Sequence, residues 1–192
     1  GAGFIYYSSD AGVTWTAQEA GVLSTDDYYV VEFAHPGSKR VGFVAGENNA
    51  MAKTLDGGTT WSSVTGPSGA AEILTIDVRS DRTVFVGDNA GGLYVTYNGG
   101  VSWTQITSWT GTGAGQVNSL EALDDARLVM LSRTAGGVGV LHLSRDGGRS
   151  WEALTTPTNT GLNGVDFVRP DFVIAVGEPQ GGTGMIIRTT SF

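Results

Sequence analysis

An eight-residue pattern occurs four times in this 192-residue chain and ends each time in tryptophan. The four copies run from Ser8 to Trp15, Thr54 to Trp61, Thr96 to Trp103 and Ser144 to Trp151. Successive tryptophans are 46, 42 and 48 residues apart, which is the period of a propeller blade or a similar array. The spacing therefore predicts a repeat architecture.

Each copy has the composition of a tight hairpin turn. Residues that favour β-strands precede it, as in Phe4 to Tyr7 and Leu93 to Val95, and Thr or Ser followed by Trp closes it. Between them, Asp or Asn can accept hydrogen bonds from nearby backbone amides, and Gly supplies the positive φ that such turns need. Trp adds a large apolar anchor. The pattern predicts one rigid corner per copy.

The consensus S/T-x-D-x-G-x-T/S-W resembles the Asp-box, or BNR repeat, of sialidases, sortilin-like receptors, xyloglucanases and photosystem II assembly-factor-like propellers. A second sequence pattern recurs at 42–47, 84–88 and 172–178. This pattern makes the photosystem II assembly-factor-like propellers the most similar of these groups. The resemblance implies an all-β propeller of four-stranded antiparallel blades. The repeats in this chain supply about four blades, so a partial or open propeller is one expectation. It implies little about activity, because enzymes, receptors and assembly factors share the box.

Composition narrows the class further. Thirty glycines and only 16% charged residues suit short strands joined by tight turns. No 18-residue apolar run or signal-like start is present, so no membrane insertion is expected. The absence of cysteine excludes disulfides, thiolate catalysis and Cys-based zinc sites. A net charge of -8 argues against a nucleic-acid partner, because binding phosphates needs a basic surface.

The repeat divides residues 1–192 into one propeller with incomplete ends. We expect a partial blade at 1–20, full blades at 21–65, 66–107 and 108–156, and a partial blade at 157–192. The end strands can complete a fourth blade and close a small ring. Alternatively, the chain is part of a longer polypeptide or an assembly that covers the open faces, and we favour this arrangement because similar propellers have more blades.

We interpret the box residues as structural. The boxes lie on one rim and on different blades, whereas a catalytic pair needs its carboxyl groups within about 5 to 10 Å. One box carries an uncharged Asn in place of Asp, which also indicates a role in the turn. The structural set is Asp10, Trp15, Asp56, Trp61, Asn98, Trp103, Asp146 and Trp151.

One carboxylate lies between apolar neighbours on each predicted innermost strand. These residues are Glu32, Asp77, Glu121 and Asp166. One interpretation is an axial acidic ring that attracts a cation or a basic side chain. The other, which we favour, is that each carboxylate bonds backbone amides or an arginine such as Arg79 or Arg169, because a buried charge must be paired.

The loop face opposite the boxes is the candidate binding face. Its candidate residues are Glu47, Asn48, Asp88, Asn89, Trp109, Arg133 and Glu178. Trp109 is the only tryptophan outside a box. It fits two interpretations equally, since a loop aromatic can bind a sugar or a protein, and a tryptophan can also cap the end of a core.

No catalytic motif accompanies the repeat. The Arg-Ile-Pro motif of sialidases is absent, and His35 and His142 lack a Ser or Cys nucleophile motif. We therefore expect no catalytic residues, metal or cofactor. The predicted function is a non-catalytic scaffold or protein-binding module, alone, as a homo-oligomer or in a larger assembly such as a virion or cell-surface complex. The alternative is a glycan-binding module or a fragment of a sialidase-like glycoside hydrolase. The resemblance implies a location outside the cytoplasm.

Overall fold

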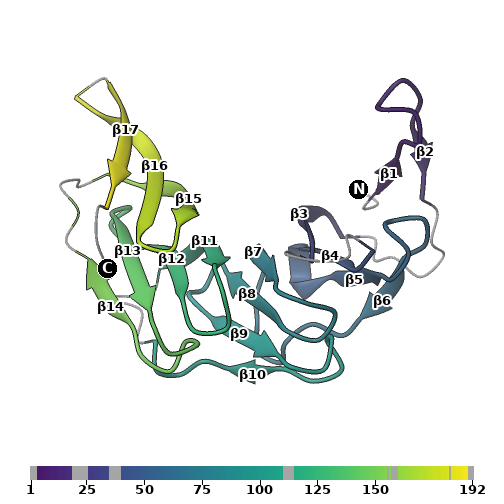
Figure 1. The fold of residues 1–192 in the computed structure, drawn as a ribbon, viewed down its shortest axis with the longest axis horizontal. Coiled ribbons are helices and arrows are strands. Elements are labelled where there is room, and N and C mark those ends of the chain that lie inside the picture. The colour runs from purple at the N-terminus through teal and green to yellow at the C-terminus, as the bar shows by residue number, and fades with distance from the viewer. Residues whose placement is uncertain are drawn as a thin grey trace.

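The computed structural model describes residues 4–18, 26–34, 40–109, 115–154, 156, 160–181 and 183–189. In these ranges, seventeen strands form five antiparallel sheets along an open arc (Figure 1). The only helical element described is a short 3-10 turn, η1 (Glu47–Asn49). The predicted all-β class and the four-stranded blades are confirmed.

The sheets follow one another in chain order. The N-terminal hairpin is β1 (Tyr6–Tyr7) with β2 (Thr16–Ala17). The first full blade is β3 (Tyr28–Phe33), β4 (Gly42–Gly46), β5 (Met51–Thr54) and β6 (Ser62–Val64). The second is β7 (Ile73–Val78), β8 (Val84–Asp88), β9 (Leu93–Thr96) and β10 (Thr104–Gln105). The third is β11 (Gln116–Ala122), β12 (Leu128–Arg133), β13 (Gly139–Ser144) and β14 (Glu152–Leu154). The end sheet is β15 (Leu162–Arg169), β16 (Phe172–Gln180) and β17 (Thr183–Arg188).

The strands are ordered from the inside of the arc to the outside. β3, β7, β11 and β15 line its concave side, and each contacts the next (Figure 1). The N-terminal hairpin and the end sheet lie at opposite ends of the arc and do not pair with each other. The concave wall is therefore built from one inner strand per sheet.

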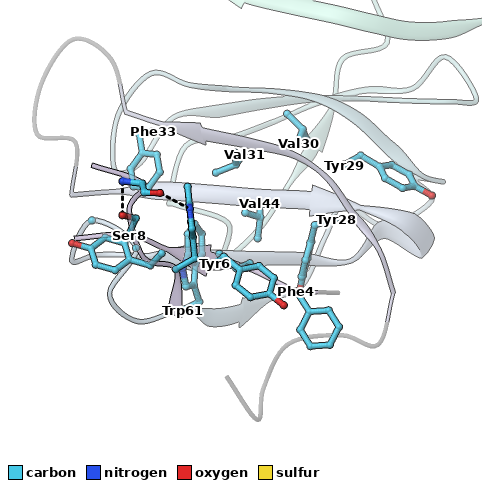
Figure 2. A pocket seen from close by; sticks show the side chains of 16 residues that line it. Phe4, Tyr6, Ser8, Tyr28, Tyr29, Val30, Val31, Phe33, Val44 and Trp61 are labelled. Atoms are coloured by element: carbon cyan, nitrogen blue, oxygen red, sulfur yellow. Dashed lines mark hydrogen bonds between the residues drawn. The ribbon is translucent and has the colours of Figure 1, made fainter. Parts of the chain in front are cut away.

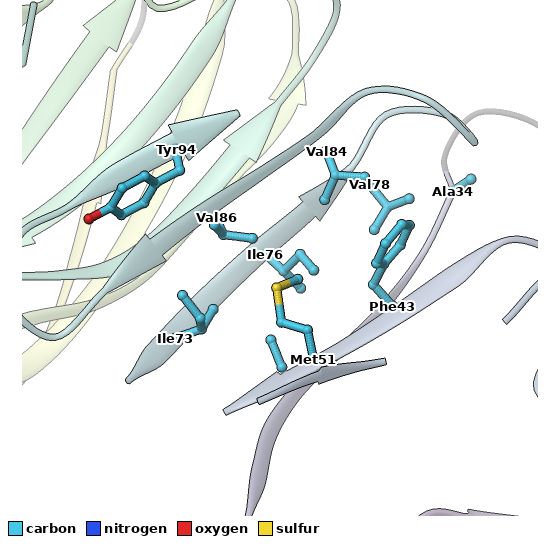
Figure 3. Packing of buried hydrophobic residues seen from close by; sticks show 10 residues of the cluster. Ala34, Phe43, Met51, Ile73, Ile76, Val78, Val84, Val86 and Tyr94 are labelled. Carbon is cyan, nitrogen blue, oxygen red and sulfur yellow. The ribbon is translucent and has the colours of Figure 1, made fainter. Parts of the chain in front are cut away.

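The core lies between the sheets rather than within any one of them. At the first interface, Phe43 and Met51 of one blade pack against Ile73, Ile76 and Val86 of the next (Figure 3). Two further clusters repeat this arrangement between the second and third blades and between the third blade and the end sheet. Each blade is thus stabilised mainly by apolar side chains that its neighbours bury.

In its copies at 42–47 and 172–178, the second recurring pattern marks a close approach of two backbone segments. A methyl group on Gly46 would lie 2.1 Å from the Asp27 carbonyl oxygen, and one on Gly177 would lie 2.3 Å from that of Gly161. The same carbonyls accept hydrogen bonds from the next residues, Glu47 N (2.9 Å) and Glu178 N (2.8 Å). The glycine is needed because the end of the second strand lies against the segment that leads into the innermost strand.

In the described parts of the chain, no helix is long and apolar enough to cross a membrane.

Candidate functional site

The three boxes that carry aspartate form the same network of turn hydrogen bonds. In the box of the first blade, Asp56 Oδ1 accepts from Thr60 N (2.8 Å), and Asp56 Oδ2 accepts from Thr60 Oγ1 (2.7 Å). The Thr54 hydroxyl accepts from Gly58 N (2.9 Å) and donates to Asp56 Oδ1 (2.8 Å). Asp10 and Asp146 repeat these bonds in their own boxes. Each box carboxylate is occupied within its own turn.

The box with asparagine keeps the hydrogen bond from the backbone amide of Ser102 and reverses the direction of the bond with the Ser102 hydroxyl. Asn98 Oδ1 accepts from Ser102 N (2.9 Å), as an aspartate does. Its Nδ2 donates to Ser102 Oγ (2.8 Å), where the aspartates accept from the equivalent hydroxyl. The amide closes the turn without a charge, so the turn does not depend on the carboxylate being ionised.

The hydrogen bonds also determine how the box carboxylates titrate. Bonds from the Thr14 side chain, the Thr60 backbone and the Ser150 side chain lower the pKa values of Asp10, Asp56 and Asp146 to about 2. Because these groups remain ionised near neutral pH, they cannot act as general acids there. Within the described ranges, no group of three or more His, Asp and Glu side chains could hold a metal ion.

The box tryptophans pack toward the preceding sheet. Trp61 is 5% exposed and lies in a cluster with Val44 and Ala52, with Ile5 of the hairpin against it. Trp103 and Trp151 pack against the clusters at the first and second blade interfaces. Trp15 is 62% exposed, and no described sheet precedes its hairpin.

The predicted binding residues of the loop face are largely engaged in joining loops. Glu47 Oε2 accepts from Asp27 N (3.3 Å), and Asn48 Nδ2 donates to Asp26 Oδ1 (3.0 Å). Asp88 is buried, and its carboxylate accepts from the backbone amides of Ala71, Ala90 and Gly92. These bonds hold the loops of the face in place, and the burial of Asp88 removes its side chain from direct contact with a ligand.

The third blade departs from this scheme. By strand register, Arg133 occupies the position of Glu47 in the first blade, Asn89 in the second and Glu178 in the end sheet. Its Nη2 donates to Glu178 Oε1 of the end sheet (2.5 Å). Beside it, between the second and third blades, lies a polar pocket of about 330 Å³ whose walls include Asn89, Gln116 and Thr134. Of the predicted binding residues, Asn89 and Arg133 thus both line this pocket.

Trp109 belongs to the core in this structure. It is 8% exposed, its Nε1 donates to Gly91 O (3.0 Å), and its ring meets the His142 ring edge-on with centroids 4.3 Å apart. His142 is also buried and lies 2.9 Å from Ser132 Oγ through Nε2. The Trp109 ring is therefore too buried to stack on a sugar. His35, the other histidine, lies outside the described residues.

The buried histidine makes the fold sensitive to acid. Burial lowers the pKa of His142 from 6.5 to about 4. The unfolded chain therefore takes up a proton that the folded chain rejects, so stability present above pH 6.5 is lost as the pH falls through 4. Between pH 7 and 4.5 we expect a loss of about 2 to 3 kcal/mol from this group. Urea unfolding at both pH values measures it. His142→Gln should show a correspondingly smaller loss, and an unchanged loss would assign the acid sensitivity to other groups.

The four inner-strand carboxylates lie at equivalent positions on the concave wall. Each faces a strand partner at the same point of its sheet, namely Phe43, Phe85, Val129 and Ile174 for Glu32, Asp77, Glu121 and Asp166. Burial is the largest cause that raises the pKa of Glu121 to about 8, together with the charges of Asp77, Asp166 and Glu32 and against the opposing charge of Arg79. The structure therefore brings the other three carboxylates within electrostatic reach of Glu121.

Asp77 also bonds the neighbouring blade. Its Oδ2 accepts from Ala122 N (2.9 Å), and Arg79 Nη1 donates to Ala122 O (3.0 Å). Asp77 thus bonds a backbone amide of the next blade and also lies within electrostatic reach of Glu121, although the sequence presented pairing and an acidic ring as alternatives. Burial outweighs the amide bond, so the pKa of Asp77 is raised to about 6.

The raised pKa of Asp77 predicts a second, opposite pH effect. The folded chain holds the proton of the Asp77 carboxyl more tightly than the unfolded chain does. The stabilisation that this provides is fully present below pH 3.8 and is lost as the pH rises through 6. We expect Asp77→Asn to be more stable than the parent by about 2 kcal/mol at pH 7.5, with the difference vanishing near pH 4. Urea unfolding at the two pH values tests this, with exposed Asp171→Asn as the control. A destabilised Asp77→Asn at pH 7.5 would contradict it.

An aromatic groove was not identified from the sequence. Between the N-terminal hairpin and the first blade lies an apolar cavity of about 670 Å³, with the rings of Phe4, Tyr6, Tyr28 and Trp61 around it (Figure 2). Phe4, Tyr6 and Trp15 are exposed. The sequence signal for this groove was the density of aromatic residues in 4–7 and 28–33. Only the fold shows that these two segments face each other.

Comparison with known proteins agrees with this architecture. The family model described as Photosynthesis system II assembly factor YCF48 matches residues 22–166, and the BNR/Asp-box repeat model matches residues 6–17. No curated protein sequence matches the chain.

Solved propellers resemble the fold at low sequence identity. A structure of YCF48 bound to D1 peptide has a TM-score of 0.62 and 21% identity, over 78% of this chain and 46% of that one. YCF48 from Cyanidioschyzon merolae has a TM-score of 0.66 and 15% identity, over 99% and 64%. The GH74 enzyme of Niastella koreensis has a TM-score of 0.74 and 19% identity, over 95% and 32%. The chain spans less than two thirds of each of these proteins, and identities this low show the fold alone.

Proposed function

The chain belongs to the family of the photosynthesis system II assembly factor YCF48, and we propose that it is a non-catalytic propeller that binds another protein. The observation that carries the proposal is the extent of the family match, which begins before β3 and ends within β15. It therefore includes all three full blades. A YCF48 propeller has been solved with a bound D1 peptide, so this fold supports recognition of a polypeptide.

The loop face opposite the boxes is the proposed contact surface. The bonds of Glu47, Asp88 and Arg133 hold its loops together, so binding orders little additional backbone and the entropic cost of association is low. The polar pocket beside Asn89 and Gln116 offers amide donors and acceptors for a partner's backbone or side chains.

Binding to an array of 15-residue peptides tests this function. We expect the protein to retain a subset of the peptides, with affinity reduced at least fivefold in the double variant Asn89→Ala/Gln116→Ala. Glu152→Gln, on an outer strand, serves as the control and should bind like the parent. Equal binding by parent and double variant would move the site elsewhere. Retention of no peptide would overturn the function.

A glycan-binding role is the second candidate, and the aromatic groove is the observation that favours it. The exposed rings of Phe4, Tyr6 and Trp15 offer apolar faces to a sugar, and GH74 enzymes share the fold. Incubation with xyloglucan oligosaccharides tests both binding and turnover. Binding that Tyr6→Ala abolishes would support a glycan module. Release of smaller sugars would instead support a glycoside hydrolase.

We also propose that the chain acts within a larger assembly outside the cytoplasm, such as a virion or cell-surface complex. Large apolar side chains are exposed at both ends of the arc, including Phe4 and Val31 at one end and Val176 and Ile186 at the other. Such surfaces favour association. Light scattering should give a mass well above 20.0 kDa, and a monomer would contradict self-assembly. Fractionation of the source cells or particles tests the location.

A further inference from the structure

We propose that the end sheet of one copy of this chain packs against the N-terminal hairpin of a second copy, as neighbouring sheets pack within the arc. This inference rests on the proposed assembly and names its partner and the contact. Inside the chain, the interfaces between successive sheets are built from the same strand positions. The two ends of the arc present the two halves of that interface, one half at each end (Figure 1).

The side of each blade that faces the following sheet uses equivalent positions of its second and third strands. Strand register pairs these positions as Ala45 with Met51, Gly87 with Leu93, Leu131 with Leu141 and Val176 with Ile186. In the three full blades, the third-strand residue of this pair is at most 2% exposed. In the end sheet, Ile186 is 74% exposed and Val176 is 44% exposed, since no described sheet follows it. The end sheet therefore carries one half of the interface without its partner.

The opposite side of each blade faces the preceding sheet. Two positions before each box, the third strand of the repeat carries Tyr6, Ala52, Tyr94 and His142. In the full blades this residue is at most 4% exposed, whereas Tyr6 of the hairpin is 55% exposed. Trp15 of the same hairpin is also exposed, in contrast to the buried Trp61. The hairpin therefore carries the other half of the interface.

The two halves match because the interfaces inside the chain bring these same positions together. Met51 and Tyr94 belong to one core cluster, between the first and second blades. Ile186 is the counterpart of Met51, and Tyr6 is the counterpart of Tyr94. We therefore expect Ile186 of one copy to bury against Tyr6 of the next, which is a head-to-tail contact between two different faces.

A polar contact at the first blade interface also has its counterpart at the free end. Lys53 Nζ donates across that interface to Asp81 O (3.2 Å) and to Gly99 O of the next box (3.3 Å). Arg188 occupies the register position of Lys53 in the end sheet and is exposed. The box position of Gly99 is Ala11 in the hairpin, so Arg188 would donate to the Ala11 carbonyl of a second copy.

A second copy is the occupant that satisfies both ends at once. Each face lacks the partner that the other face supplies, so one contact between two copies leaves the same pair of faces free at the outer ends. The arc is curved, and a head-to-tail contact continues its curve (Figure 1). Head-to-tail contacts form a ring when the rotation closes and a filament when it does not. A closed ring of copies would leave neither face in water.

Sedimentation over a range of protein concentrations tests the contact with charged variants. Ile186→Glu and Tyr6→Lys each place one charge in an apolar contact, and each should weaken self-association at least tenfold. The double variant Tyr6→Lys/Ile186→Glu brings opposite charges together only in a head-to-tail contact, and should associate at least tenfold more tightly than either single variant. Val101→Glu is the matched control, because Val101 is exposed on the box rim of the second blade and should change association less than twofold. Thermal unfolding of each variant shows that the fold is kept.

The outcomes separate this inference from the proposals on which it rests. Unchanged association in both single variants would overturn the contact and leave self-assembly standing. A double variant no tighter than the single variants would also overturn it, since like faces would then meet. A parent that stays monomeric at every concentration would overturn the contact and self-assembly together, while the peptide array still tests protein binding. Dilute samples contain the separated chain, in which Tyr6 and Trp15 are exposed.

Discussion

Trp61→Ala is expected to lower the free energy of unfolding by about 3 to 5 kcal/mol, whereas Trp15→Ala should lower it by less than about 1 kcal/mol. The two residues occupy the same position of their boxes. Trp61 is buried and meets the Phe33 ring edge-on, with centroids 6.3 Å apart, beside Val44 and Ala52. Trp15 is exposed. The difference arises because only Trp61 fills an interface between two described sheets.

Urea unfolding followed by circular dichroism measures both variants under the same conditions. Neither substitution removes a box aspartate or hydroxyl. Trp15→Ala also removes the bond from Trp15 Nε1 to Gly12 O (3.1 Å), whereas Trp61 Nε1 has no partner among the described residues, so the turn bond alone would make Trp15→Ala the more costly change. Similar losses for the two variants would contradict the packing described here, and would mean that Trp15 is covered in solution. That outcome would itself support an assembly that buries the N-terminal hairpin.

Gly46→Ala is expected to destabilise the protein by more than about 3 kcal/mol or to prevent folding. The added methyl group would lie 2.1 Å from the Asp27 carbonyl oxygen and 2.8 Å from the Tyr28 Cα. Both neighbours are backbone atoms, so the start of β3 must move. That movement breaks the bond from Glu47 N to Asp27 O. The loss reflects steric overlap and a broken loop contact together.

Gly184→Ala is the control for the same chemical change. No atom lies within 4 Å of the added methyl group at Gly184, and the residue has no positive φ. Its stability should remain within about 0.5 kcal/mol of the parent. Soluble yield and thermal unfolding distinguish the two variants. A normally stable Gly46→Ala would show that the loop leading into β3 adjusts without cost.

Local patterns were sufficient to predict the fold because each blade is built from contacts that recur along the chain. The box turn needs only the bonds among eight residues, such as those between Thr54, Asp56 and Thr60. These short-range interactions appear directly in the sequence as Asp, Gly and hydroxyl side chains at constant spacing. The alternation of the inner strands likewise showed which carboxylates share a face.

The candidate sites were harder to predict because burial depends on the neighbouring blade. Trp109 and Asp88 read as loop residues available to a ligand, yet both are buried. Trp109 lies in the cluster between the second and third blades, and Asp88 accepts bonds from loop amides of its own blade. The aromatic groove forms from two segments that separate sheets bring face to face, and no spacing rule connects them. The Arg133 to Glu178 ion pair joins residues 45 positions apart, so it also depends on how adjacent sheets dock.

The sequence by itself determined the repeat, the four-stranded blade and the hydrogen-bonded turn of each box, since these depend on hydrogen bonds and apolar periodicity within single units. Only the tertiary structure decided which polar groups meet across units. Glu32, Asp77, Glu121 and Asp166 are separated by more than forty residues each, yet the other three act on Glu121 along a single wall. Desolvation and charge interact through space and not along the chain, so the protonation of that wall follows from the packing of the blades.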